Sequence, residues 1–192
     1  MSQQNYHEEI DDAELVRLSL LDSANFVHII NRYQTKMLQY VRRLGARRLE
    51  DAEDIVQDIF LKVYLNLNDF NLDLQFSSWL YRIAHNQTIS QFRKNQVRPE
   101  LYSSPLDEHG FESLSSDLSL EKELDLKLLQ EHLKEALLSL NAQQREIIVL
   151  KFFEERSYQE ISDILKKPTG SVASLLNRTK KALLKKLQGN IK

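Results

Sequence analysis

The stretch that decides the fold runs from Ser157 to Leu184 and reads SYQEISDILKKPTGSVASLLNRTKKALL. Four apolar residues at helical spacing would pack two helices against each other: Ile161, Leu165, Val172 and Leu175. Ser162 is the small residue that such a crossing needs, and Lys166–Thr169 makes a short turn. Pro168 favours the turn because it disfavours helix at Lys167. The pattern predicts a helix-turn-helix.

Capping signals and an outward polar face support this prediction. Ser157 with Glu160 forms a capping box for the first helix, and Thr169 is the expected N-cap of the second. Lys166 stands at the turn position where glycine is favoured. Serine and asparagine can bond base edges, whereas arginine and lysine can bond guanine or phosphate. The outward face offers Ser171, Ser174, Asn177, Arg178 and Lys181. The alternative is a plain helical hairpin with a solvated basic face.

Helical periodicity extends over most of the remaining chain. It predicts four helices before residue 97, the second of which runs from Phe26 to Leu44 with Gly45 as its C-cap. Ile55, Ile59 and Val63 mark the inward face of the third. A leucine stripe from Leu124 to Leu137 and a capping box at Asn141 and Gln144 precede the helix-turn-helix. With only 4 Gly and 3 Pro in the chain, we expect an all-α protein.

Composition divides this chain into two small helical domains. Between residues 97 and 120 the helical periodicity is absent, and prolines, serines and acidic residues are frequent. This composition predicts a flexible acidic linker. The expected divisions are therefore 10–96 for the first domain, 97–120 for the linker and 121–188 for the second domain. The linker's length would let the two domains lie about two DNA turns apart.

Charge is balanced overall but segregated along the chain. The net charge is -2, yet residues 156–192 carry nine bases against two acids. Residues 50–58 are acidic, and so is the linker. Such segregation favours basic faces for a polyanion and acidic faces for another partner, although ordinary solvated faces are the alternative reading of any one block.

Several classes of function lack their signatures. The chain has no cysteine, which excludes disulfides and thiolate metal sites. The histidines show no metal spacing, and there is no Gly-rich phosphate loop, so we expect no cofactor, no metal and no enzymatic activity. The chain has neither an apolar signal core nor a run long enough to span a membrane, so we expect a cytoplasmic protein without membrane insertion.

Three separated stretches together resemble the extracytoplasmic-function (ECF) group of sigma-70 family RNA polymerase sigma factors. They are DAEDIVQDIFLKVY at 51–64, FSSWLYRIAHN at 76–86, and Ser157–Ile161 continuing through Pro168–Val172. The resemblance spans about Ala13 to Leu187. It implies a first domain equivalent to sigma region 2 and a second equivalent to region 4, which together direct core polymerase to promoters through the −10 and −35 elements.

The resemblance assigns a polymerase-docking helix to the first stretch. Spacing places the polar residues on one face, opposite Ile55, Ile59 and Val63. By resemblance, the partner of this face is the clamp coiled coil of the largest polymerase subunit, and the flap region is a second contact. The expected docking residues are Glu53, Asp54, Gln57, Asp58 and Leu61.

The second stretch is similar to the segment that opens and reads the −10 element. Separated strands need aromatic surfaces and backbone charge, and Tyr81 is one available aromatic. Phe76 and Trp79 are more typical of core at this spacing. Asn86 matches a residue implicated in capturing a flipped base. The expected −10 contacts are Arg82, Asn86, Arg93 and Lys94, and His85 is interpreted as a structural or surface residue.

The third stretch implies −35 recognition. Its expected contacts are Lys166, Lys167, Thr169, Ser171, Ser174, Asn177, Arg178 and Lys181. Ala173 stands where the family often has a base, which predicts weaker or altered direct readout. The acidic linker resembles the family's connector, which passes through the basic RNA-exit path of the polymerase. An anti-sigma factor is a further expected partner. A stand-alone transcriptional regulator is the rival hypothesis, but it would not need the helix at 51–64.

Overall fold

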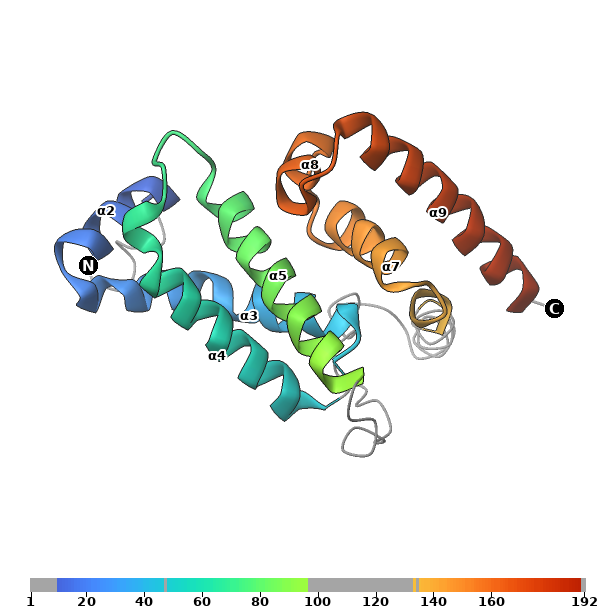
Figure 1. The fold of residues 1–192 in the computed structure, drawn as a ribbon, viewed down its shortest axis with the longest axis horizontal. Coiled ribbons are helices and arrows are strands. Elements are labelled where there is room, and N and C mark those ends of the chain that lie inside the picture. The colour runs from blue at the N-terminus through green and yellow to red at the C-terminus, as the bar shows by residue number, and fades with distance from the viewer. Residues whose placement is uncertain (1–9, 47, 97–132, 134, 191–192) are drawn as a thin grey trace, which may run out of the picture.

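The structure, a computed structural model, describes residues 10–46, 48–96, 133 and 135–190. These residues form helices, turns and loops, with no strand among them, so the all-α prediction is confirmed for this part of the chain (Figure 1). The first module contains α2 (Asp12–Leu21), η1 (Ser23–Asn25), α3 (Phe26–Leu44), α4 (Leu49–Leu65), η2 (Leu67–Asp69) and α5 (Phe76–Gln96). The second contains α7 (Ala142–Ile148), η5 (Val149–Phe153), α8 (Tyr158–Leu165) and α9 (Thr169–Asn190).

The core of the first module follows the predicted periodicity. Ile55, Ile59 and Val63 on α4 are at most 1% exposed, so the inward face predicted for this helix is confirmed. The predicted α3 and its C-cap are also confirmed. Gly45 has a φ of 122°, a conformation that glycine adopts without a Cβ clash, and its N–H bonds back into the last turn of α3.

The second module begins with two confirmed capping boxes and contains one feature that periodicity did not predict. Asn141 and Gln144 cap α7, and Ser157 and Glu160 cap α8. Between these two boxes, α7 ends at Ile148 and the chain continues as the π-helical turn η5. Such a turn adds a residue to the helical repeat. It precedes a loop whose charged residues contact the first module.

The register of α9 differs slightly from the prediction. The helix begins at Thr169, so the expectation that Thr169 is its N-cap is wrong by one residue. The Thr169 hydroxyl instead donates to the side chain of Gln159 at 3.4 Å. Leu176 is 2% exposed and packs inward, whereas the predicted Leu175 is only half-buried. On a long helix, adjacent leucines compete for one buried position and the sequence alone does not choose between them.

The two modules pack directly against each other. Helix α8 lies on α5, and α7 and η5 lie on α3, so the buried residues of both modules form one continuous core (Figure 1). The predicted linker lies outside the described residues, as does most of the leucine stripe. Leu133 and Leu137 of that stripe are described and are helical.

Candidate nucleic-acid and polymerase interfaces

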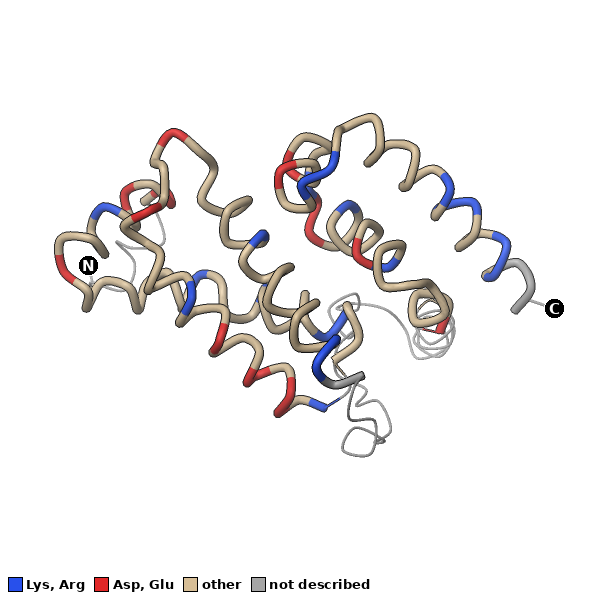
Figure 2. The backbone as a smooth tube through the Cα atoms, viewed as in Figure 1, with Lys and Arg blue, Asp and Glu red and all other residues tan. Residues whose placement is uncertain are grey.

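Helix α4 presents the expected acidic face. Glu53, Asp54 and Gln57 are exposed, and Leu61 is 57% exposed. Figure 2 shows the acidic residues of α4 in red along the helix. Asp58 is half-buried because its carboxylate accepts a hydrogen bond from the amide of Gln87 on α5 at 2.7 Å. The structure therefore brings the five predicted docking residues onto one side of α4, and Asp58 additionally ties α4 to α5.

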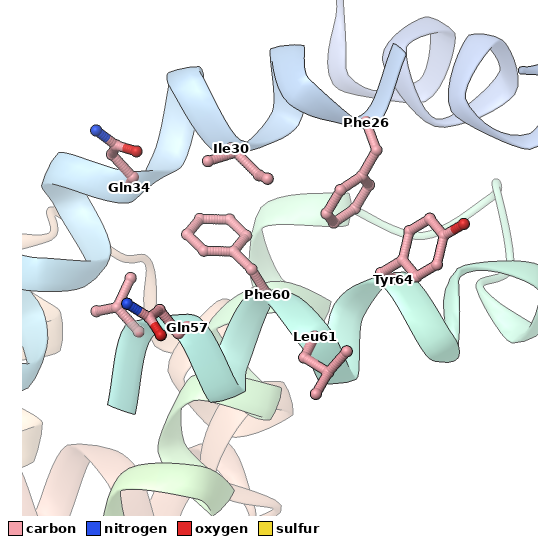
Figure 3. Close-up of a pocket in the computed structure, with 8 residues that line it drawn as sticks. Phe26, Ile30, Gln34, Gln57, Phe60, Leu61 and Tyr64 are labelled. Carbon is pink, nitrogen blue, oxygen red and sulfur yellow. The ribbon is translucent and has the colours of Figure 1, made fainter. Parts of the chain in front are cut away.

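An apolar groove of about 410 Å³ lies beside this face, between α3 and α4. Gln57 and Leu61 belong to both the groove and the acidic face, so the two surfaces are continuous (Figure 3). Tyr64, at one end, is 44% exposed and packs edge-on against Phe26 at 5.2 Å between ring centroids. The lining residues are Phe26, Ile30, Gln34, Val56, Gln57, Phe60, Leu61 and Tyr64. The contribution of α3 was not predicted, because it requires knowing which helix lies next to α4.

The predicted −10 residues lie along α5. Arg82, Asn86 and Arg93 share one side of the helix, since 82 and 93 are about three turns apart. Asn86, Arg93 and Lys94 are exposed and Arg82 is half-buried.

The aromatic residues at 76–81 fall into two groups according to what they pack against. Phe76 is 3% exposed, and Trp79 is half-buried against Phe70, with 5.1 Å between ring centroids, as expected for core residues. Tyr81 is fully buried beneath the second module, and the Arg156 guanidinium lies over its ring at 4.4 Å. Burial and the carboxylate of Glu154 raise the pKa of Tyr81 above its ordinary value. The expectation that Tyr81 offers a surface to DNA is therefore wrong for this conformation.

The second module forms the predicted helix-turn-helix from α8 and α9. Val172, Leu176 and Thr179 face inward, and the polar residues face outward. Lys167 is half-buried, and the other seven predicted −35 residues are exposed: Lys166, Thr169, Ser171, Ser174, Asn177, Arg178 and Lys181. Basic residues also continue along the later turns of α9 (Figure 2). The arrangement gives one helix a continuous polar and cationic surface that fits a nucleic-acid groove.

The start of α8 is fixed by an ionised carboxylate. Glu160 accepts hydrogen bonds from the Ser157 N–H at 2.8 Å and from Arg156 at 3.0 Å. Burial acts to raise the pKa of Glu160, but the hydrogen bonds from Ser157 and Arg156 and the charge of Arg156 outweigh it, and the pKa lies below its usual value. A depressed carboxyl pKa stabilises the fold above the unfolded-state pKa, and this contribution is lost as the pH falls through the folded-state pKa.

The turn between α8 and α9 contains backbone strain at Lys166. This residue adopts the left-handed conformation, with φ 52° and ψ 47°, which costs a residue with a Cβ about 1 kcal/mol. The Ser162 hydroxyl steadies the turn by donating to the Lys167 carbonyl. A lysine at this position, where glycine is favoured, therefore lowers the stability of the fold.

Lys166→Gly is expected to raise the free energy of unfolding by about 0.5–1 kcal/mol and the melting temperature by a few degrees. The same change removes an exposed cation and should weaken DNA binding. Thermal unfolding and a DNA titration measure the two effects. Lys167→Gly is the matched control, because Lys167 is not among the residues with positive φ. Equal destabilisation by both substitutions would contradict the assignment of strain to Lys166.

Family models match both modules of the chain. The model described as Sigma-70 region 2 matches residues 29–98, and the model described as Sigma-70, region 4 matches residues 130–183. The ECF RNA polymerase sigma factor SigW of Bacillus subtilis (strain 168) is 34% identical over 171 residues, which cover 87% of this chain and 91% of SigW. The ECF RNA polymerase sigma-E factor of Escherichia coli (strain K12) is 33% identical over 189 residues, covering 94% and 96%.

Two solved structures share the fold. CnrH, in complex with the cytosolic domain of CnrY, superposes with a TM-score of 0.68 at 22% identity, covering 93% of this chain and 97% of CnrH. The sigma factor RpoE of Bartonella quintana, in complex with the anti-sigma factor NepR, superposes with a TM-score of 0.64 at 24% identity, covering 85% and 97%. Among the described residues, no helix is long and apolar enough to cross a membrane, and no cluster of side chains could hold a metal ion.

Proposed function

The chain belongs to the ECF group of the sigma-70 family of RNA polymerase sigma factors, which direct promoter-specific transcription initiation, and from this premise we propose a division of labour among its surfaces. Helix α4 docks core polymerase, α5 reads and helps to melt the −10 element, and α9 reads the −35 element. The proposed boundaries of the two DNA-binding domains are 10–96 and 121–188, with residues 97–120 as the connector.

The docking surface consists of the acidic face of α4 and the adjoining apolar groove. Exposed carboxylates of Glu53 and Asp54 would attract and orient basic groups of a partner, and Leu61 and Tyr64 would bury apolar side chains. This combination suits the proposed partner, the clamp coiled coil of the largest polymerase subunit. The flap region is the proposed contact of the second module.

DNA recognition is divided between two basic surfaces. On α5, the exposed amide of Asn86 would pair with the edge of a flipped base. The phosphate backbone of the DNA would be bound by Arg82, Arg93 and Lys94. On α9, Ser171, Ser174 and Asn177 would reach base edges. DNA phosphates would be bound by the cations Lys166, Lys167, Arg178 and Lys181. Thr169, at the start of α9, would contact the DNA backbone. Half-buried Ala173 adds no donor, so we expect direct readout of few bases.

We further propose that melting uses binding energy rather than catalysis, so the protein itself is not an enzyme, and that it works in the cytoplasm, where core polymerase and DNA are found. An anti-sigma factor is the proposed regulator. A helix of such a partner that occupies the groove between α3 and α4 would compete directly with core polymerase for Leu61 and Tyr64.

The observation that carries the proposal is that one chain holds both an acidic face continuous with an open apolar groove and an exposed basic recognition helix. Run-off transcription with purified core enzyme across a promoter library tests it. We expect discrete transcripts that require this chain and whose templates share two elements. Binding to operator DNA without any effect on core enzyme would favour the stand-alone regulator, and a folded, inhibitor-free chain that starts no transcript would overturn the proposal.

A further inference from the structure

A hydrogen bond joins the docking helix to the helix that carries the proposed −10 contacts. Helices α4 and α5 lie side by side (Figure 1). The side-chain amide of Gln87 on α5 donates to Oδ2 of Asp58 on α4 at 2.7 Å. This short distance is typical of a hydrogen bond to a charged acceptor, which is about twice as strong as one between neutral groups.

The position of Gln87 does not suit a contact with DNA. Gln87 is 7% exposed, whereas its neighbour Asn86 is exposed. A buried amide is unfavourable unless it is hydrogen-bonded, and Asp58 supplies the acceptor. Asp58 is half-buried and bonded to α5, unlike the exposed Glu53 and Asp54 of the same helix. The two bonded residues therefore face each other rather than the solvent.

This bond restricts α5 in a way that apolar packing does not. Buried residues such as Ile59 on α4 and Leu80 on α5 contribute apolar surface to the core, and the burial of such surface is not directional. A hydrogen bond instead holds its two heavy atoms within a few tenths of an ångström of a set distance. Buried polar groups are known to define register between packed helices. The bond between Asp58 and Gln87 can therefore define the rotation of α5 about its own axis.

The rotation of α5 decides where Asn86 points. Successive residues of an α-helix lie about 100° apart around the axis, so the direction of Asn86 is fixed when Gln87 is held against α4. A helix with its side chains has a radius of about 5–6 Å, and a rotation of about 20° would move a side-chain tip by about 2 Å. A hydrogen bond to a base edge does not survive such a displacement.

We propose that Asp58 and Gln87 are positioning residues for base capture. Their hydrogen bond sets the rotation of α5 on the docking helix, and it thereby holds Asn86 where its amide pairs with the flipped base. This inference rests on the −10 role proposed above for α5. Asp58 acts here through its acceptor oxygen rather than through its charge. The helix that docks polymerase and the side chain that reads the base are thus held in a fixed relation.

Base discrimination by the holoenzyme tests the proposal. The probes are a single-stranded oligonucleotide with the −10 sequence obtained from the promoter library and its single-base replacements. The full chain is assembled with saturating core enzyme, so that a loss of docking does not enter the comparison. Fluorescence anisotropy gives the affinity for each probe. The captured base is the position at which Asn86→Ala lowers the ratio of the two affinities.

Asp58→Ala and Gln87→Met should each lower the discrimination at that position about tenfold, as Asn86→Ala does, without changing the affinity for the replaced oligonucleotide. Adding Asn86→Ala to either variant should lower the discrimination no further, because the bond acts through Asn86. Asp58→Asn keeps an acceptor oxygen and removes the charge. Its discrimination should stay within about threefold of that of the unmodified chain.

The matched control is Asn66→Ala. Asn66 donates to the Lys62 carbonyl at the same distance, 2.7 Å, but its bond stays at the end of α4, so the control should keep full discrimination. A variant that only destabilises the fold would weaken the binding of all probes alike. If Asp58→Ala fails to fold, as judged by circular dichroism, Gln87→Met decides, because it preserves the length of the side chain.

The outcomes separate this inference from the proposed function. Full discrimination in folded Asp58→Ala and Gln87→Met, beside a loss in Asn86→Ala, overturns the positioning role and leaves the −10 function intact. An equal loss in Asp58→Asn and Asp58→Ala also overturns it, because the effect would then belong to the charge. If Asn86→Ala lowers discrimination at no position, the proposed −10 contact is wrong and the positioning role is wrong with it.

Discussion

Asp54→Arg combined with Asp58→Arg is expected to abolish binding to core polymerase and to reduce run-off transcription at least about 100-fold. Both changes place a cation where the docking face of α4 offers carboxylates, so the basic groups of the partner would meet like charge. Repulsion of this kind at an interface costs several kcal/mol, and about 2.7 kcal/mol already corresponds to 100-fold. Pull-down with core enzyme and run-off transcription measure the two losses.

The control must account for the second role of Asp58. Its bond to Gln87 joins α4 to α5, so the double variant should be somewhat less stable, and circular dichroism must establish that it is folded. Asp69→Arg with Asp73→Arg makes the same charge change at two exposed acids of the same module and should retain core binding. A folded Asp54/Asp58 variant with normal transcription would show that the polymerase docks elsewhere.

Local features of the fold were predictable because they depend on residues that are close together in the sequence. The face of α4 follows from the spacing of Ile55, Ile59 and Val63, and both capping boxes follow from residue pairs three positions apart. The unfavourable residue at the α8–α9 turn was also visible, since the sequence places Lys166 where glycine is favoured. Each of these depends on interactions within about one or two helical turns.

Features that depend on tertiary packing were not predictable in the same way. The groove needs α3 beside α4, and the hydrogen bond from the Tyr40 hydroxyl to the Glu146 carboxylate joins residues 106 positions apart. The π-turn η5 arises where the chain leaves α7 to reach the first module, and periodicity does not encode it. One signal was available. Glu146 precedes the apolar run Ile147–Leu150, and a carboxylate in such a setting predicts a buried acid that needs partners. The sequence does not identify those partners.

The basic surface of α9 leads to a prediction about salt. Arg178→Ala with Lys181→Ala should weaken holoenzyme binding to a promoter duplex by about 10- to 100-fold at moderate salt, if each side chain neutralises one phosphate. Each lost phosphate contact should also lower the slope of log affinity against log salt concentration by about 0.9, giving a total change of about 2. Fluorescence anisotropy over a series of salt concentrations measures both quantities.

The control lies further along the same helix. Lys185→Ala with Lys186→Ala removes the same charge, but Lys186 donates to the Ser139 hydroxyl at 2.6 Å and is directed back to its own module. This pair should therefore change the slope much less. Arg178 donates from its Nε to the Ser174 carbonyl at 3.4 Å. Loss of affinity without a change in slope would mean that its guanidinium contacts a base rather than a phosphate. Equal slopes for both double variants would instead mean that the whole of α9 attracts DNA diffusely, and that the predicted face has no special role in binding.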